Sequence, residues 1–114
     1  MLGNNPSLVK RYRALISCRV EGRTVYLEGK YDSNQLASLQ KRLFEFIVAS
    51  SEESVINLEK VSGSGSGLVA VLIACIRLSI KSGKKTSFTG FSDQLRGLIQ
   101  LSNLGEILFS VESV

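Results

Sequence analysis

Residues 55–80 read VINLEKVSGSGSGLVAVLIACIRLSI, and this stretch determines the fold class. It begins with a short apolar run, Val55 to Leu58, which is typical of a buried strand. It ends in a segment, residues 68–81, that is apolar on nearly every side and predicts a helix covered on most of its surface. The segment between them, residues 62–67, contains only glycine and serine. Strand, polar loop and helix in this order indicate an α/β domain.

The residues before this stretch predict two more strands and a helix. Residues 14–20 and 23–29 are apolar runs separated by Glu21-Gly22, as in a β-hairpin, and the second run alternates apolar and polar side chains. Asp32 or Ser33 can cap a helix that continues to about residue 49, because its leucines recur at helical spacing. Residues 1–13 are polar, and we expect a flexible N-terminal arm before a single domain at 14–114.

The residues after this stretch extend the alternation of strands and helices. Residues 86–90 predict a strand, Ser92 can cap a helix that closes at Asn103, and residues 107–111 predict a last strand. The whole order is strand, strand, helix, strand, helix, strand, helix, strand. It predicts a mixed or parallel sheet with helices packed against it.

The composition excludes several classes of enzyme. The chain has 114 residues and no histidine, so it cannot supply a Ser-His-Asp triad or a histidine-based zinc site. Its two cysteines, Cys18 and Cys75, are too few for a structural zinc site, and we expect buried thiols in a reducing compartment. We therefore expect no enzyme, no cofactor and no metal.

The start of the chain and its apolar runs bear on location. The first residues have neither the charged region nor the apolar region of a signal peptide. The longest apolar run, Leu68 to Ile76, is shorter than the roughly 20 residues that a membrane span needs. We expect a cytoplasmic protein without direct membrane insertion.

The Gly/Ser loop, residues 62–67, admits three interpretations. Nucleotide binding is disfavoured because Leu68 stands where a dinucleotide fingerprint has its third glycine, and no Gly-Lys-Ser/Thr precedes the helix. A phosphorylated serine here would add roughly −1.5 to −2 charge beside a helix N-terminus and change a binding surface. Alternatively, the serines are only helix caps in a polar connector.

Several motifs resemble those of STAS domains, the family that includes the SpoIIAA-type anti-sigma-factor antagonists. The match comprises residues 55–62, the serine-rich turn, Gly67-Leu68 and the Gly-x-x-Asp motif at Gly29-Lys30-Tyr31-Asp32. From Leu72 through Gly90-Phe91-Ser92-Asp93 to Asn103-Leu104 the chain is similar to MlaB, a STAS subunit of a phospholipid-transport ABC complex. The resemblance covers about residues 14–111 and implies a mixed sheet with helices on one face.

The loop departs from the pattern of this family at the regulatory position. STAS members typically read Asp-Ser/Thr-x-Gly-Leu, and the hydroxyl after the aspartate is phosphorylated or contacts a partner. Aligned on Gly67-Leu68, this chain has Ser64 at the aspartate position and Gly65 at the hydroxyl position, in a loop one residue shorter. Moving the gap instead places Ser64 at the hydroxyl position, but still supplies no aspartate. Ser64 and Ser66 remain candidates for phosphorylation, and the departure favours constitutive binding.

The resemblance implies a non-enzymatic adaptor that binds and regulates a partner protein through the Gly/Ser loop and helix 68–81. The main hypothesis is an MlaB-like subunit on the ATPase of a lipid-transport ABC complex. The alternative is an anti-sigma-factor antagonist that binds an anti-sigma serine kinase and is phosphorylated by it. The candidate partner-binding residues are Ser62, Gly63, Ser64, Gly65, Ser66, Gly67, Leu68, Val69 and Val71.

The apolar helix also suggests self-association. If residues 68–81 carry more apolar surface than one sheet covers, then Val69, Val71 and Ile76 meet a partner or a second copy. A homodimer is therefore an open alternative.

A nucleic-acid-binding protein is a further, less favoured alternative. The net charge is +4, with basic clusters at Lys10-Arg11 and Arg13, at Lys41-Arg42, and at Lys81 with Lys84-Lys85. These clusters are dispersed, and no stacking aromatics lie among them, as single-strand binding would require. We therefore expect no nucleic-acid partner.

Overall fold

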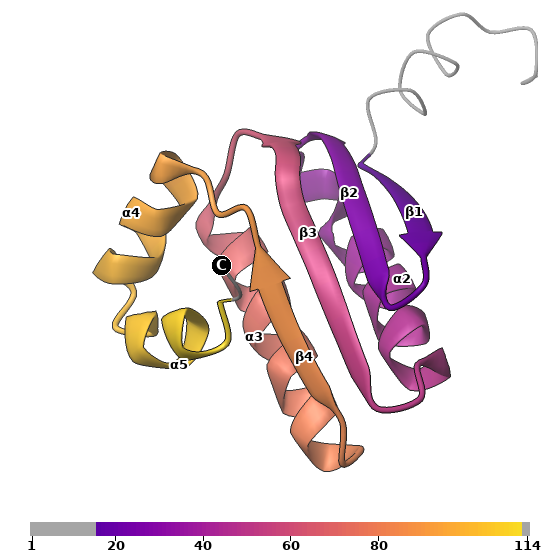
Figure 1. Cartoon of the computed structure of the whole chain (residues 1–114). Coiled ribbons are helices and arrows are strands. Elements are labelled where there is room, and N and C mark those ends of the chain that lie inside the picture. Colours follow the sequence, from indigo (N-terminus) through magenta and orange to yellow (C-terminus); the bar gives the residue numbers. More distant parts are fainter. Residues whose placement is uncertain (1–15, 113–114) are drawn as a thin grey trace, which may run out of the picture.

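A four-stranded mixed sheet forms the centre of the molecule (Figure 1). The computed structural model describes residues 16–112, so the expected arm at 1–13 and the start of the first expected strand lie outside the described part. The strands lie side by side in chain order: β1 (Ser17–Glu21), β2 (Thr24–Lys30), β3 (Glu53–Ser62) and β4 (Lys85–Thr89). β1 is antiparallel to β2, whereas β2, β3 and β4 are parallel.

Two helices cover one face of this sheet (Figure 1). A short 3-10 turn, η2 (Ser33–Gln35), leads into α2 (Leu36–Ala49), and α3 (Ser66–Lys81) packs beside α2. The side chains of Ile56, Leu58 and Phe88 are buried between sheet and helices. This arrangement confirms the expected α/β class with a mixed sheet. No helix between residues 16 and 112 is long and apolar enough to cross a membrane.

β3 is much longer than the expected strand at 55–58. The sequence did not reveal its second half, because a β-bulge interrupts the alternation of apolar and polar side chains. Tyr26 of β2 pairs with Asn57, but Glu28 pairs with Lys60, so β3 holds one extra residue there. The Asn57 side-chain oxygen accepts a hydrogen bond from the Glu59 amide at 2.9 Å. After the bulge the strand continues to Ser62, so the Gly/Ser loop begins at the carboxyl end of β3.

The sequence predicted a last strand at 107–111, and this prediction is wrong. α4 (Asp93–Leu101) is followed by a short helix, α5 (Gly105–Ser110), and both lie beyond β4 in Figure 1. A short apolar run such as Ile107 to Phe109 fits a helix as well as a strand, and here Leu108 alone is fully buried. The strand-like pairing begins only after the helix, where the Phe88 amide donates to the Val111 carbonyl at 2.9 Å.

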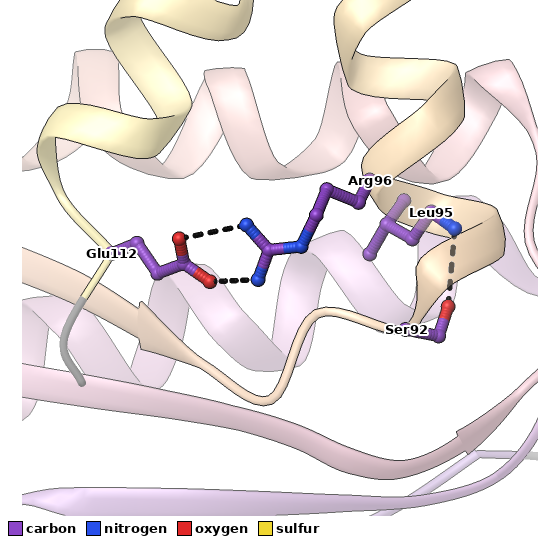
Figure 2. A network of polar contacts seen from close by, with 4 residues as sticks. All are labelled: Ser92, Leu95, Arg96 and Glu112. Carbon is purple, nitrogen blue, oxygen red and sulfur yellow. Dashed lines mark hydrogen bonds and ion pairs between the residues drawn. The ribbon is translucent and has the colours of Figure 1, made fainter.

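An ion pair holds this C-terminal segment against α4 (Figure 2). The guanidinium of Arg96 binds both carboxylate oxygens of Glu112, with Nη1 3.0 Å from Oε1. The same guanidinium lies 5.7 Å from the ring centre of Phe91 and 5.4 Å from that of Phe109. Ser92 caps α4 as expected, because its hydroxyl accepts from the Leu95 amide at 3.1 Å.

Candidate functional site

The Gly/Ser loop and Tyr31, the residue after β2, lie together at the carboxyl ends of the parallel strands. Because β2 and β3 are parallel, their carboxyl ends lie together, with Lys30 paired to Ser62. The Tyr31 amide then donates to the Ser62 carbonyl at 2.8 Å, which ties the two chain segments at the point where both strands end. Binding sites of open α/β sheets commonly lie at such an edge.

The N-terminus of α3 has no side-chain cap. The helix begins at Ser66, two residues before the expected start, and its N-cap residue is Gly65. The Gly65 carbonyl accepts from the amides of Leu68 and Val69, at 3.0 and 3.4 Å. The interpretation of the loop serines as caps of α3 is therefore wrong, and the amides of the first turn have no side-chain acceptor.

The two candidate phosphorylation sites lie in opposite environments. Ser66 is exposed on the first turn of α3. The Ser64 hydroxyl is buried, and no group within residues 16–112 forms a hydrogen bond with it. Ser66 is therefore open to a modifying enzyme, whereas Ser64 is accessible only if the loop moves.

Tyr31 is the residue of this site that the sequence did not single out beyond its place in the Gly-x-x-Asp motif. A Cβ atom placed on Gly65 would lie 2.7 Å from the Tyr31 hydroxyl oxygen, and one on Gly67 would lie 3.2 Å from it. The Gly67 position is also closed by the Cδ1 atom of Leu36. A phenol ring thus packs directly over the loop, a contact between residues 34 positions apart that periodicity does not reveal.

Asp32, the acidic residue of the same motif, has a local structural role. Its carboxylate accepts from the Asn34 amide at 2.9 Å and caps η2. Asp32 thus caps the 3-10 turn, whereas α2 itself begins only at Leu36, with Gln35 at its N-cap and no side-chain cap, so neither expected residue caps the long helix.

The expectation that Val69, Val71 and Ile76 present apolar surface to a partner or a second copy is wrong. Leu68, Val69 and Val71 are at most 4% exposed, and Ile76 is 7% exposed. They pack in the core between α3 and its neighbours, so their side chains form no binding surface and give no support for self-association. The candidate surface is reduced to Ser62 to Gly67 and the adjacent Tyr31.

The cysteines show no feature of a reactive or metal-binding site. Burial raises the pKa of the Cys75 thiol to about 12. Burial also raises the pKa of Cys18, an effect that the Arg42 guanidinium, 3.8 Å from the sulfur, partly offsets. Cys18 is only half-buried, contrary to expectation. Within residues 16–112, no cluster of three His, Cys, Asp or Glu side chains could hold a metal ion.

Parts of the basic clusters serve the fold itself. Arg42 donates to the Ile16 carbonyl, and Lys84 donates to the last carbonyls of α2. Lys10, Arg11 and Arg13 lie outside the described residues. Since three of the fourteen basic residues precede residue 16, eleven remain beside all ten acidic ones, so the domain itself is nearly neutral. The net charge of residues 16–112 therefore gives little support for a nucleic-acid-binding role.

Comparison with known proteins identifies the fold. No protein family model and no curated protein matches the chain. Among solved structures, unphosphorylated SpoIIAA matches with a TM-score of 0.64 and 20% identity, over 81% of this chain and 84% of that one. An anti-sigma factor antagonist from Mycobacterium paratuberculosis matches with a TM-score of 0.65 and 18% identity, over 82% and 81%. Phosphorylated SpoIIAA from Bacillus matches with a TM-score of 0.61 and 20% identity, over 81% and 86%. The chain therefore has the STAS fold of the anti-sigma factor antagonists.

Proposed function

We propose that the chain is a regulatory binding protein that acts as an anti-sigma-factor antagonist. The observation that carries this proposal is the position of the Gly/Ser loop, exposed at the carboxyl edge of the sheet at the uncapped start of α3. The loop adjoins a shallow hollow of about 390 Å³ lined by Lys30, Tyr31, Asp32 and Ser33. Loop and hollow bring exposed polar groups together with the aromatic ring of Tyr31, a residue type enriched at protein interfaces, so this surface suits binding of a protein.

We further propose that binding is constitutive. A neighbour with this fold, SpoIIAA, is known in an unphosphorylated and a phosphorylated form. In the present chain Gly65 stands at the position where the STAS pattern has its regulatory hydroxyl, and the Ser64 hydroxyl is buried. Ser66 is the remaining candidate for phosphorylation at this surface.

An MlaB-like subunit on an ABC ATPase is the second hypothesis, and it depends only on the sequence resemblance of the second half of the chain, from Leu72 to Leu104. Both hypotheses place the partner on the same loop, but they differ in the class of partner. We favour the antagonist because the structural neighbours described above are antagonists.

A charge at Ser66 tests both hypotheses. Ser66→Glu places a negative charge on an exposed residue of the proposed surface, and an acidic residue in the first turn of a helix does not destabilise it. The matched control is Gln94→Glu, an exposed first-turn position of α4 far from the loop in sequence. The variants and the wild type are used to isolate partners from the native cells, and the partners are identified by mass spectrometry.

The antagonist hypothesis predicts that wild type and Gln94→Glu recover an anti-sigma factor, and that Ser66→Glu recovers at least tenfold less, roughly 1.4 kcal/mol of binding free energy. Recovery of an ABC ATPase with the same pattern would replace this hypothesis by the MlaB-like one. Equal recovery by all three proteins would place the binding surface elsewhere, and recovery of neither partner would contradict both hypotheses.

A further inference from the structure

The Tyr31 ring occupies the space that a side chain at position 65 would need. A Cβ atom on Gly65 would lie 2.7 Å from the Tyr31 hydroxyl oxygen, 2.8 Å from Cε2 and 2.9 Å from Cζ. All three distances are far shorter than the 3.5–4.0 Å of ordinary contacts between such atoms. Any residue other than glycine at 65 therefore requires the ring to move.

The backbone gives no reason for glycine at this position. Gly65 has φ −168° and ψ 167°, which is extended geometry that every residue adopts. Gly63 differs, because its φ of +72° lies in the left-handed region that favours glycine. Position 65 is also the N-cap of α3, where serine, threonine, aspartate and asparagine are preferred because they accept from the free amides. Space alone thus excludes serine here, and the Tyr31 ring fills that space.

Several contacts hold Tyr31 in this position. Its amide donates to the Ser62 carbonyl, and the half-buried ring packs against the core. The next residue, Asp32, is held as the cap of η2. Leu36 also approaches the loop, because a Cβ atom on Gly67 would lie 2.2 Å from its Cδ1 atom and 3.2 Å from the Tyr31 hydroxyl oxygen. Displacing the ring would therefore disturb its packing against the core.

We infer that Tyr31 and Gly65 form a matched pair, in which the phenol ring replaces the side chain at the N-cap of α3. The pair keeps the loop in one form, without a serine at the position of the regulatory hydroxyl. Tyr31 acts as a positioning residue for the loop, and its hydroxyl oxygen lies where the side chain of residue 65 would be. The regulatory meaning of the pair rests on the proposed function, because only a STAS-type binding loop would be switched at this position.

A double-mutant cycle tests the pair without any partner protein. Gly65→Ser, Tyr31→Leu and the double variant are compared with the wild type by thermal unfolding. With Tyr31 present, Gly65→Ser should lower Tm by roughly 4–8 °C, the shift that a moderate packing defect produces in a domain of this size. With Tyr31→Leu the same substitution should raise Tm, because the new hydroxyl caps α3 without a collision.

Gly65→Ala separates the collision from the capping, since it adds the Cβ atom and no hydroxyl. It should lower Tm like Gly65→Ser when Tyr31 is present, and should leave Tm unchanged in the Tyr31→Leu background. The control is Gly97→Ser, because a Cβ atom there meets nothing within 4 Å, and no fall in Tm is expected.

Equal effects of Gly65→Ser in both backgrounds would overturn the inference, whatever partner the protein binds. Conversely, a strong coupling in a protein that captures no anti-sigma factor would leave the pair intact and contradict the proposed function. The two failures are thus distinguishable.

Discussion

At the scale of single residues, three buried hydroxyl groups form a directed chain of hydrogen bonds. Ser79 donates to the Cys75 carbonyl at 2.9 Å, so its bond with Thr86 must have Thr86 as the donor. Thr86 then has no proton left for Ser54, 2.9 Å away, so Ser54 donates to Thr86. Every donor in the chain is used, and Thr86 is its central link between β3, β4 and α3.

Thr86→Val removes this link and leaves the buried Ser54 hydroxyl without its acceptor. We expect the free energy of unfolding to fall by about 1–3 kcal/mol, the usual cost of an unpaired buried polar group. Urea denaturation of the wild type and the variant measures this loss of free energy of unfolding. The matched control is Thr89→Val on the same strand, because the buried Thr89 hydroxyl has no hydrogen-bond partner within residues 16–112. That variant should be neutral or more stable, and equal losses in both variants would contradict the directed chain.

At the scale of elements, Lys84 joins the start of β4 to the end of α2. Its ammonium group donates to the carbonyls of Ile47 and Val48, at 3.2 and 2.6 Å. These belong to the last turn of α2, which carries the negative end of the helix dipole. The Ile47 carbonyl also accepts from the amide and the hydroxyl of Ser50. A lysine that sequence analysis assigned to a basic cluster is thus a cap for another helix.

Lys84→Met keeps the apolar stem of the side chain and removes the charge. We expect a loss of about 1 kcal/mol in the free energy of unfolding, because two helix-end carbonyls lose a cationic donor. Lys85→Met is the control, since its exposed neighbouring side chain should contribute little. Urea denaturation at low and high salt checks the result, and the loss should shrink with salt. Equal losses in the two variants would refute the capping role.

The elements that the sequence predicted well have either a long apolar pattern or a clear N-cap residue. Residues 68–81 predicted α3 to within two residues, and Ser92 predicted the start of α4. Short patterns failed where tertiary contacts decide the structure. The bulge at Asn57 hid the second half of β3, and the run at 107–109 is helical, with Leu108 buried and Phe109 packed at the margin of the core. The candidate loop was placed correctly in the chain, but its contact with Tyr31 depends on the pairing of β2 with β3.

At the scale of the whole molecule, one ion pair connects the segment after α5 to α4. Of the three ion pairs among residues 16–112, Arg19–Glu21 and Arg23–Glu53 have side chains more than half exposed, whereas the Glu112 side chain is 19% exposed. Arg96 of α4 binds Glu112, and the segment that carries Glu112 also pairs with β4 (Figure 2). The Arg96 side chain is 39% exposed, so this pair is the least exposed of the three but is still reached by solvent, which limits its contribution to stability.

The pair makes the stability of the domain depend on pH. The hydrogen bonds from Arg96, together with its positive charge, hold the pKa of Glu112 below its usual value in the folded protein. The folded state therefore binds fewer protons than the unfolded state, and the pair stabilises the domain at pH above the ordinary pKa of a glutamate. This contribution is lost as the pH falls through the lowered pKa of Glu112.

Glu112→Gln should therefore be less stable than the wild type at pH 7, and the difference should disappear below the lowered pKa. Urea midpoints over a series of pH values measure both proteins. Glu106→Gln is the control, because Glu106 is exposed and forms no ion pair within residues 16–112. A difference between Glu112→Gln and wild type that stays constant with pH would show that the charge of Glu112 is not what stabilises this contact with α4.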